Sequence, residues 1–123
     1  MANLSSDKTR IEEYYGLPEE DGWKIIDISI SDITTMISYT HGDTTVIFEQ
    51  DVIRNNMGNM NTENAIVVPM AVYEENDGFF IALNGGEYFM LYWIYDGYLL
   101  SILGNLNKDE LLNLAYSTKI VEF

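Results

Sequence analysis

The chain has 123 residues, of which 47% are hydrophobic and 13% aromatic, so it can fold around one core and falls outside the disordered class. Its 20 acidic and 6 basic residues give a formal net charge of −14, which repels nucleic-acid backbones and anionic membrane surfaces. The absence of cysteine excludes disulfides and thiolate chemistry. We therefore expect a single domain over residues 1–123 that binds no nucleic acid.

The N-terminal residues 1–16 are predicted to form a short helical segment. A helix over residues 5–15 would be ended by Gly16. Its apolar face would comprise Ile11, Tyr14 and Tyr15. The following Leu17-Pro18 pair forces an extended or turning backbone, because the residue before proline is restricted away from the helical region. Residues 17–119 should then form a sheet and a C-terminal helix.

Three runs rich in β-branched residues predict an antiparallel meander over residues 23–30, 34–40 and 44–50. In the first run, strict alternation separates Lys24, Ile26, Ile28 and Ile30 from Trp23, Ile25, Asp27 and Ser29. We expect one of these two faces to be buried. The second and third runs should form a hairpin across residues 41–43, with inward side chains at Ile37, Tyr39, Val46 and Phe48.

The middle of the chain is less regular. Five asparagines around Gly58 predict a surface loop over residues 51–64. A strand over residues 65–73 should follow, and Pro69 places it at a sheet edge or a bulge because proline cannot donate to the ladder. We then expect a turn over residues 74–78, a strand over 79–83 and a second turn over 84–86. The residues that follow, from 88 onward, are the most informative part of the sequence.

That stretch predicts a β-hairpin followed by a helix. The apolar runs 88–95 and 98–103 flank Asp96-Gly97, a pair that tolerates the positive φ angles of a tight two-residue turn. Asn107 can then cap a helix while Glu110, three residues on, reaches back to it. Altogether we predict an α+β domain: an antiparallel sheet of about six or seven strands with a short N-terminal helix, and a C-terminal helix packed on one face.

The run 88–95 is apolar on both of its faces, whereas the C-terminal helix can cover only one. The second face must be covered by the rest of the chain, or by a partner or apolar ligand. Ordinary burial within the chain is the interpretation we favour, since small domains rarely leave large apolar patches open. If a ligand or partner face exists, the candidate residues are Trp23, Tyr88, Tyr92, Trp93 and Tyr95.

No motif in the sequence predicts catalysis, a cofactor or a metal. His41 is the only histidine, so a zinc site would need three carboxylates to converge on it. The chain has no Gly-x-Ser-x-Gly elbow, and Gly85-Gly86 lacks the remainder of a phosphate loop. We expect no enzyme and assign no catalytic, cofactor-binding or metal residues. A hydrolase would require a pocket in which a carboxylate with a raised pKa lies beside a second polar group.

The C-terminal third resembles a bacterial domain of unknown function. The matching residues are Trp93, Asp96, Gly97, Tyr98, Gly104, Leu106, Glu110, Leu111, Leu112, Ala115 and Ser117, with a weaker similarity at Leu17-Pro18, Trp23, Ile37, Tyr39 and Gly42. The resemblance covers roughly residues 17–119. The resemblance implies that the chain is the extracytoplasmic part of an anti-sigma-factor-like membrane protein or a lipoprotein of a Gram-positive bacterium. It implies no catalytic residues, and this chain has neither the membrane segment nor the lipid-attachment cysteine of such proteins.

We therefore expect the protein to act by binding another molecule. We expect a non-enzymatic extracytoplasmic sensor or interaction domain for a protein or apolar ligand. The N-terminus has no signal peptide, so the chain is either cytoplasmic or a soluble piece of a longer, membrane-anchored protein; the resemblance favours the piece. The alternative is a free-standing acidic cytoplasmic inhibitor or immunity-type protein that binds a basic partner, and salt dependence separates the two.

Overall fold

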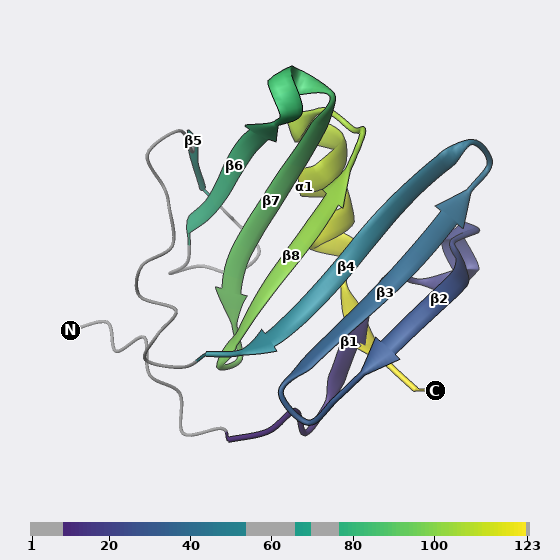
Figure 1. Cartoon of the computed structure of the whole chain (residues 1–123), viewed down its shortest axis with the longest axis vertical. Coiled ribbons are helices and arrows are strands. Elements are labelled where there is room, and N and C mark those ends of the chain that lie inside the picture. The colour runs from purple at the N-terminus through teal and green to yellow at the C-terminus, as the bar shows by residue number, and fades with distance from the viewer. Residues whose placement is uncertain (1–8, 54–65, 70–76, 123) are drawn as a thin grey trace.

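The described part of the chain is built on one antiparallel sheet. This computed structural model describes residues 9–53, 66–69 and 77–122. The sheet has seven strands in the order β2-β3-β4-β8-β7-β6-β5 (Figure 1). They are β2 (Lys24–Ile30), β3 (Thr34–His41), β4 (Thr44–Val52), β5 (Ile66–Pro69), β6 (Asp77–Leu83), β7 (Tyr88–Tyr95) and β8 (Tyr98–Gly104). Two meanders, β2-β3-β4 and β5-β6-β7-β8, thus meet where β4 pairs with β8.

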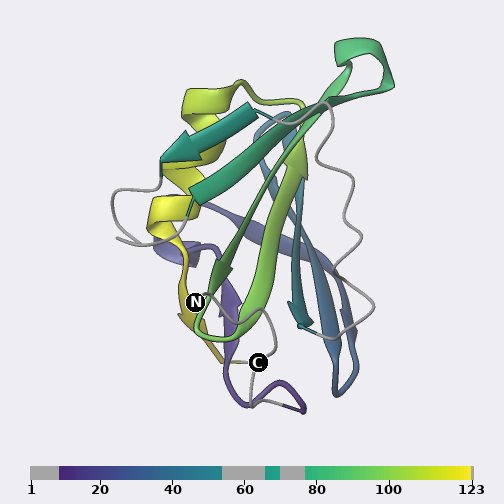
Figure 2. The same cartoon turned by 90° about the vertical axis from the view of Figure 1, so that its left-hand side faces the viewer.

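Segments from both ends of the described chain cover one face of this sheet. Helix α1 (Lys108–Ser117) packs against β7 and β8. Strands β1 (Tyr14–Gly16) and β9 (Lys119–Val121) pair antiparallel, and β1 contacts β4. Figure 2 shows α1 and the β1–β9 ribbon on the same side of the sheet. We call this side the inner face and the opposite side the outer face. The α+β architecture predicted from the sequence is confirmed.

The core lies between the inner face and its cover. Along β3 and β4, every second side chain is buried, and the four predicted inward residues Ile37, Tyr39, Val46 and Phe48 are each 0% exposed. The largest fully buried side chains are Trp93, Tyr39, Tyr98, Phe48, Leu17, Ile37, Leu91, Leu100, Ile102, Leu111 and Gln50. All but Leu17 and Leu111 come from β3, β4, β7 and β8, so the centre of the sheet carries the core.

Strands β7 and β8 form the predicted hairpin. Asp96 and Gly97 make its turn with φ angles of 53° and 82°. Positive φ at both central residues is the conformation of a two-residue turn whose twist matches the strands, and glycine adopts it without steric cost. The Tyr15 hydroxyl donates to Asp96 Oδ2 at 2.9 Å, which ties this turn to β1.

Helix α1 begins with the predicted capping box. The Glu110 amide donates to Asn107 Oδ1 at 2.9 Å, and the Asn107 amide donates to Glu110 Oε1 at 3.2 Å. Two amides at the helix start thereby gain acceptors. Leu111 and Ala115, four residues apart, are both 0% exposed and dock the helix on the sheet. No helix within the described ranges is long and apolar enough to cross a membrane.

We expect Asn107→Ala to lower the free energy of unfolding by about 1 kcal/mol, because the Glu110 amide loses its acceptor. Urea unfolding followed by far-UV circular dichroism measures the change. Asn105→Ala is the matched control, since Asn105 is exposed and lies two residues before the cap. Equal stability of the two variants would show that the capping box contributes nothing.

The predicted N-terminal helix is wrong over its described part. Residues 9–13 form no helix and Tyr14–Gly16 is strand β1, while residues 5–8 lie outside the described ranges. A helix this short is marginal unless tertiary packing supports it. Here the tertiary partners favour extended backbone instead, because Tyr15 pairs with Ile120 in β9 and its amide donates to the Gln50 side chain.

Strand β2 departs from its predicted alternation. The register shifts between Ile25 and Asp27, and the intervening Ile26 is 58% exposed. This bulge reverses the parity, so that Ile25 and Ile28 both lie opposite buried residues of β3. Since β2 is also the edge of the sheet, most of its side chains stay exposed, and the expected buried face is absent along β2.

The structure confirms part of the prediction for residues 51–86. β5 lies within the predicted strand 65–73 and at the expected edge of the sheet. The predicted strand 79–83 belongs to β6, and the predicted turn 84–86 is the 3₁₀ turn η4 (Asn84–Gly86). Asp77 and Gly78, which we expected in a turn, already belong to β6 because they pair with Pro69 and Val68. Asp51 and Val52, which we expected in the loop, belong to β4 because they pair with Leu99 and Tyr98. The rest of the predicted loop, both ends of the predicted strand 65–73 and residues 74–76 of the predicted turn lie outside the described residues, apart from residue 53.

Candidate interaction surface

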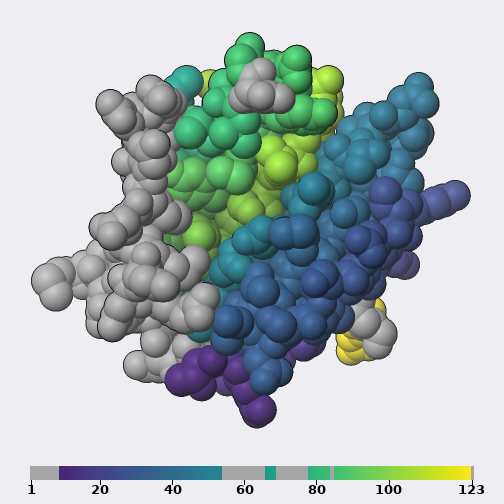
Figure 3. Space-filling model, in the orientation of Figure 1, coloured from purple at the N-terminus to yellow at the C-terminus, as the bar shows by residue number. Residues whose placement is uncertain are grey.

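The outer face of the sheet carries apolar and aromatic side chains on β5 to β8. Because cross-strand partners share a face, the register identifies its members. They are Val67, Phe79, Ile81, Leu83, Tyr88, Met90, Tyr92, Ile94, Leu99, Ser101 and Leu103, and the face continues onto β4 with Ile47, Glu49 and Asp51. Tyr88 is 48% exposed and Val67 56%. Figure 3 shows this side of the molecule, with α1 on the far side of the sheet.

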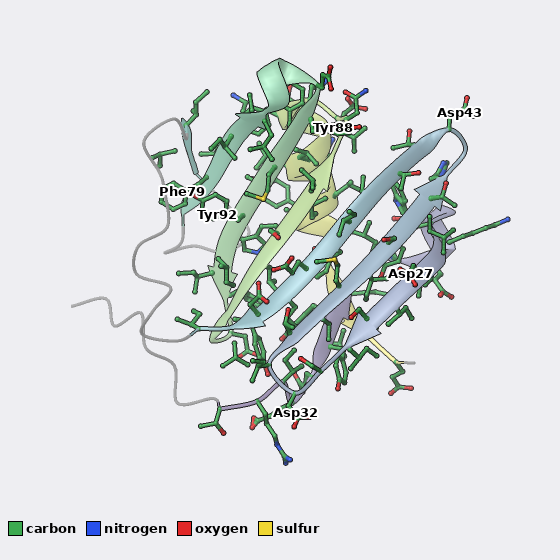
Figure 4. All side chains as sticks on the ribbon, viewed as in Figure 1. Asp27, Asp32, Asp43, Phe79, Tyr88 and Tyr92 are labelled. Atoms are coloured by element: carbon green, nitrogen blue, oxygen red, sulfur yellow. The ribbon has the colours of Figure 1, made fainter. Side chains whose placement is uncertain are left out.

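Tyr92 lies near the middle of β7 on this face. Its ring stacks on Phe79 of β6, with centroids 5.3 Å apart and planes inclined by 19°. Figure 4 shows the two side chains next to each other and Tyr88 farther along β7. Tyr92 is buried, and burial raises the pKa of its phenol. Among the described residues its hydroxyl has no hydrogen-bond partner.

A pair of carboxyl groups adjoins the apolar part of the outer face. Glu49 and Asp51 are two residues apart on β4, so their side chains point the same way. Glu49 lies opposite Ser101 of β8, which in turn lies opposite Tyr92 of β7. The Thr34 hydroxyl donates a hydrogen bond to Asp51 Oδ1.

The two carboxyl groups interact with each other. A hydrogen bond to Asp51, burial and the negative charge of Asp51 together raise the pKa of Glu49 from its ordinary 4.5 to about 8. The protonated form of Glu49, which can donate to Asp51, is therefore favoured at neutral pH.

The five candidate residues named from the sequence do not form one surface. Tyr88 and Tyr92 lie on the outer face (Figure 4). Trp93 points into the core, where it is 1% exposed and makes an edge contact with Phe48. Tyr95 has the parity of Trp93 and packs edge-on against Tyr15. Trp23 precedes β2 and its ring contacts His41. A ligand or partner role for Tyr88 and Tyr92 stays a prediction.

A family model described as a domain of unknown function, DUF4367, matches residues 1–117. The chain belongs to this family. The resemblance noted in the sequence is thus confirmed as a domain of unknown function, with a match that ends at the last residue of α1, Ser117. Searches of curated proteins and of solved structures found no match for this DUF4367 chain.

The described residues of the DUF4367 domain also form two cavities on the side of α1 and the β1–β9 ribbon. One, of about 280 Å³, lies between the ribbon and the sheet and includes Leu17, Ile25, Tyr39 and Ile120. The other, of about 300 Å³, lies between the β3–β4 hairpin and α1 and includes Trp23 and His41. Glu49 lines neither cavity. Its raised pKa is what a hydrolase would need, but it occurs here on the outer face of the sheet.

The sequence did not single out Glu49 and Asp51. In so acidic a chain, carboxylate pairs are expected by chance and carry no information by themselves. A usable signal was the alternation of Phe48, Gln50 and Val52 with the two acids, which places both acids on one face of a strand. The sequence could not show that β8 pairs with β4 and places Ser101 beside Glu49.

Proposed function

We propose that this DUF4367 domain is a non-enzymatic, extracytoplasmic binding domain that contacts a partner protein through the outer face of its sheet. The observation that carries the proposal is the exposure of Tyr88 and Val67 on a face whose other members are mostly apolar. Exposed aromatic and aliphatic side chains gathered on one face are typical of protein interfaces. Tyr88 is the natural anchor, because tyrosine offers a large contact area with few rotatable bonds.

The chemistry of the face supports a particular kind of partner. Strands β4, β6, β7 and β8 contain no lysine or arginine. Glu49 and Asp51 add acidic side chains next to the apolar area. A partner that presents apolar side chains with one basic side chain is complementary to this arrangement.

The proposed location rests on the sequence resemblance. Its residues, such as Trp93, Asp96 and Leu111, build the hairpin and the helix that form the scaffold. The resemblance implies the extracytoplasmic part of anti-sigma-factor-like membrane proteins and lipoproteins. In such a setting, a binding event on the outer face would report to the membrane-anchored remainder of the protein.

The net charge favours a second candidate function. A formal charge of −14 suits an acidic inhibitor or immunity-type protein that neutralises a basic partner. Such binding depends on long-range attraction and weakens steeply with ionic strength, whereas binding to an apolar face does not.

A photo-crosslinking experiment tests the proposal. We expect a photoreactive phenylalanine analogue at position 88 to crosslink a partner in cells, and the same group at position 30 to give none, because Ile30 is exposed but lies at the opposite edge of the sheet. With the purified partner, Tyr88→Glu should weaken binding about tenfold or more, and Ile30→Glu less than twofold, as measured by calorimetry.

Two results would contradict the outer-face proposal. Tyr88→Glu could leave the affinity unchanged, or the partner could crosslink from position 30 and not from 88. An affinity that falls by orders of magnitude between low and high salt, together with unchanged binding by Tyr88→Glu, would instead support the acidic inhibitor.

A further inference from the structure

The cavity between the β3–β4 hairpin and α1 has a chemical character of its own, separate from the outer face. It is an open depression of about 300 Å³, near the lower limit of small-molecule pockets. Aromatic and apolar walls come from Trp23, His41, Leu106 and Leu114, and the acidic residues Asp21 and Glu110 also line it. The cavity can therefore take a group of a few heavy atoms.

The aromatic wall is held in place by the backbone around it. The Trp23 and His41 rings lie 5.3 Å apart with planes inclined by 60°. His41 Nε2 lies 3.1 Å from the Asp21 carbonyl oxygen, which can only accept, so Nε2 carries a proton. Gly22 permits this approach, because a Cβ there would come within 2.7 Å of Nε2. Its φ of 96° is also a value that favours glycine.

The two carboxylates of this cavity lack cationic partners among the described residues. Neither lysine nor arginine lines the cavity. Glu110 Oε1 accepts from the Asn107 amide, a neutral donor. The ion pair that the described residues do form, between Lys119 and Glu20 at 2.7 Å, borders the other cavity. The walls thus combine negative charge with aromatic rings.

We propose that this cavity binds an organic cation, either an ammonium or a guanidinium group. A cation next to an aromatic ring is attracted by its electron-rich face, and the two carboxylates add direct attraction. An anion would be repelled, and a neutral apolar group would desolvate the carboxylates without compensation. A bare metal ion fits poorly, because the described residues bring no group of three metal-binding side chains together.

Matched probes test the charge requirement on the whole chain. Choline and its neutral carbon isostere 3,3-dimethylbutan-1-ol have the same shape and differ in one charge. Amides of Nα-acetyl-arginine and Nα-acetyl-citrulline make the same comparison for a side chain presented by a partner. We expect at least one cation to bind with a dissociation constant of about 1 mM or below, and about tenfold tighter than its neutral counterpart. Trp23 fluorescence and heteronuclear NMR report binding.

Two charge-neutralising variants locate the site. Asp21→Asn should weaken cation binding about fivefold, whereas Asp109→Asn should change it less than twofold. Asp109 is the matched control, because it adjoins Glu110 on α1 but does not line the cavity. Trp23→Leu should abolish the shift of the His41 resonances, and its folding is checked by the dispersion of the remaining NMR spectrum.

The pattern among the probes identifies the source of the cation. Preference for choline supports a free quaternary ammonium compound, and preference for the arginine amide supports a side chain on a partner. Equal binding of cations and neutral isosteres, no binding by either cation, or equal effects of Asp21→Asn and Asp109→Asn would overturn the proposal.

Discussion

We expect Gln50→Leu to lower the free energy of unfolding by about 2–4 kcal/mol, a large fraction of the stability of a small domain. Gln50 is 0% exposed and bonds the N-terminal segment to the sheet with both ends of its amide. Its Oε1 accepts from the Tyr15 amide at 2.9 Å, and its Nε2 donates to the Glu13 carbonyl at 2.9 Å. Leucine keeps the volume but leaves two backbone groups without partners. Urea unfolding measures the loss.

A control and a local readout separate this effect from general damage to β4. Thr45→Val alters an exposed side chain of the same strand and should change stability by less than about 0.5 kcal/mol. Hydrogen exchange should show the Tyr15 amide losing protection first in Gln50→Leu, since that amide is the donor to Oε1. Stability within 0.5 kcal/mol of the wild type, with Tyr15 still protected, would show that the amide bridge is unimportant.

The elements that local rules specify were predictable from the sequence. The β7–β8 hairpin follows from Asp96-Gly97 between two apolar runs, and its turn has the positive φ values that this pair tolerates. The start of α1 follows from the spacing of Asn107 and Glu110, which form the capping box. In each case the decisive contacts join residues close in sequence, so that a short window contains the whole signal.

Elements that depend on distant partners were not predictable. Tyr14 and Tyr15 suit a helix face and a strand equally well, and the choice is made by β9 and Gln50, which lie far away in sequence. The bulge at Ile26 likewise reverses the alternation of β2, although β2 contains no glycine or proline that would predict a bulge. A window around either segment lacks the information that decides its structure.

The candidate sites depend on register even more strongly. Trp23 and His41 lie 18 positions apart, and only the pairing of β2 with β3 and the position of η1 (Glu19–Asp21) bring their rings together. The pKa of Glu49 is raised by its hydrogen bond with Asp51 and by burial, and Thr34 on β3 donates to Asp51. Sequence alternation shows which face a residue takes, but not which residues meet there.

We expect the domain to lose stability as the pH rises from about 5 to 8.5, and we expect Glu49→Gln to remove much of that loss. The native state holds the Glu49 proton up to pH about 8, whereas the unfolded chain releases it near 4.5. The native state therefore binds more protons between these values, and the free energy of unfolding must fall as the pH rises through this window. After discounting for solvent screening at a partly exposed site, the fall attributable to Glu49 is about 1–2 kcal/mol. Urea unfolding at several pH values measures it.

Comparison among variants isolates the carboxyl pair from the other charges of the chain. Glu12→Gln makes the same substitution at an exposed position and should keep the wild-type slope. Asp51→Asn removes the neighbouring carboxylate, which is the first cause of the shift, and should flatten the slope as Glu49→Gln does. A wild-type slope in both β4 variants would show that the two carboxyl groups do not interact. If the slope does depend on the pair, a basic side chain that docks on the outer face must lower the Glu49 pKa, so binding would release a proton near pH 7.5.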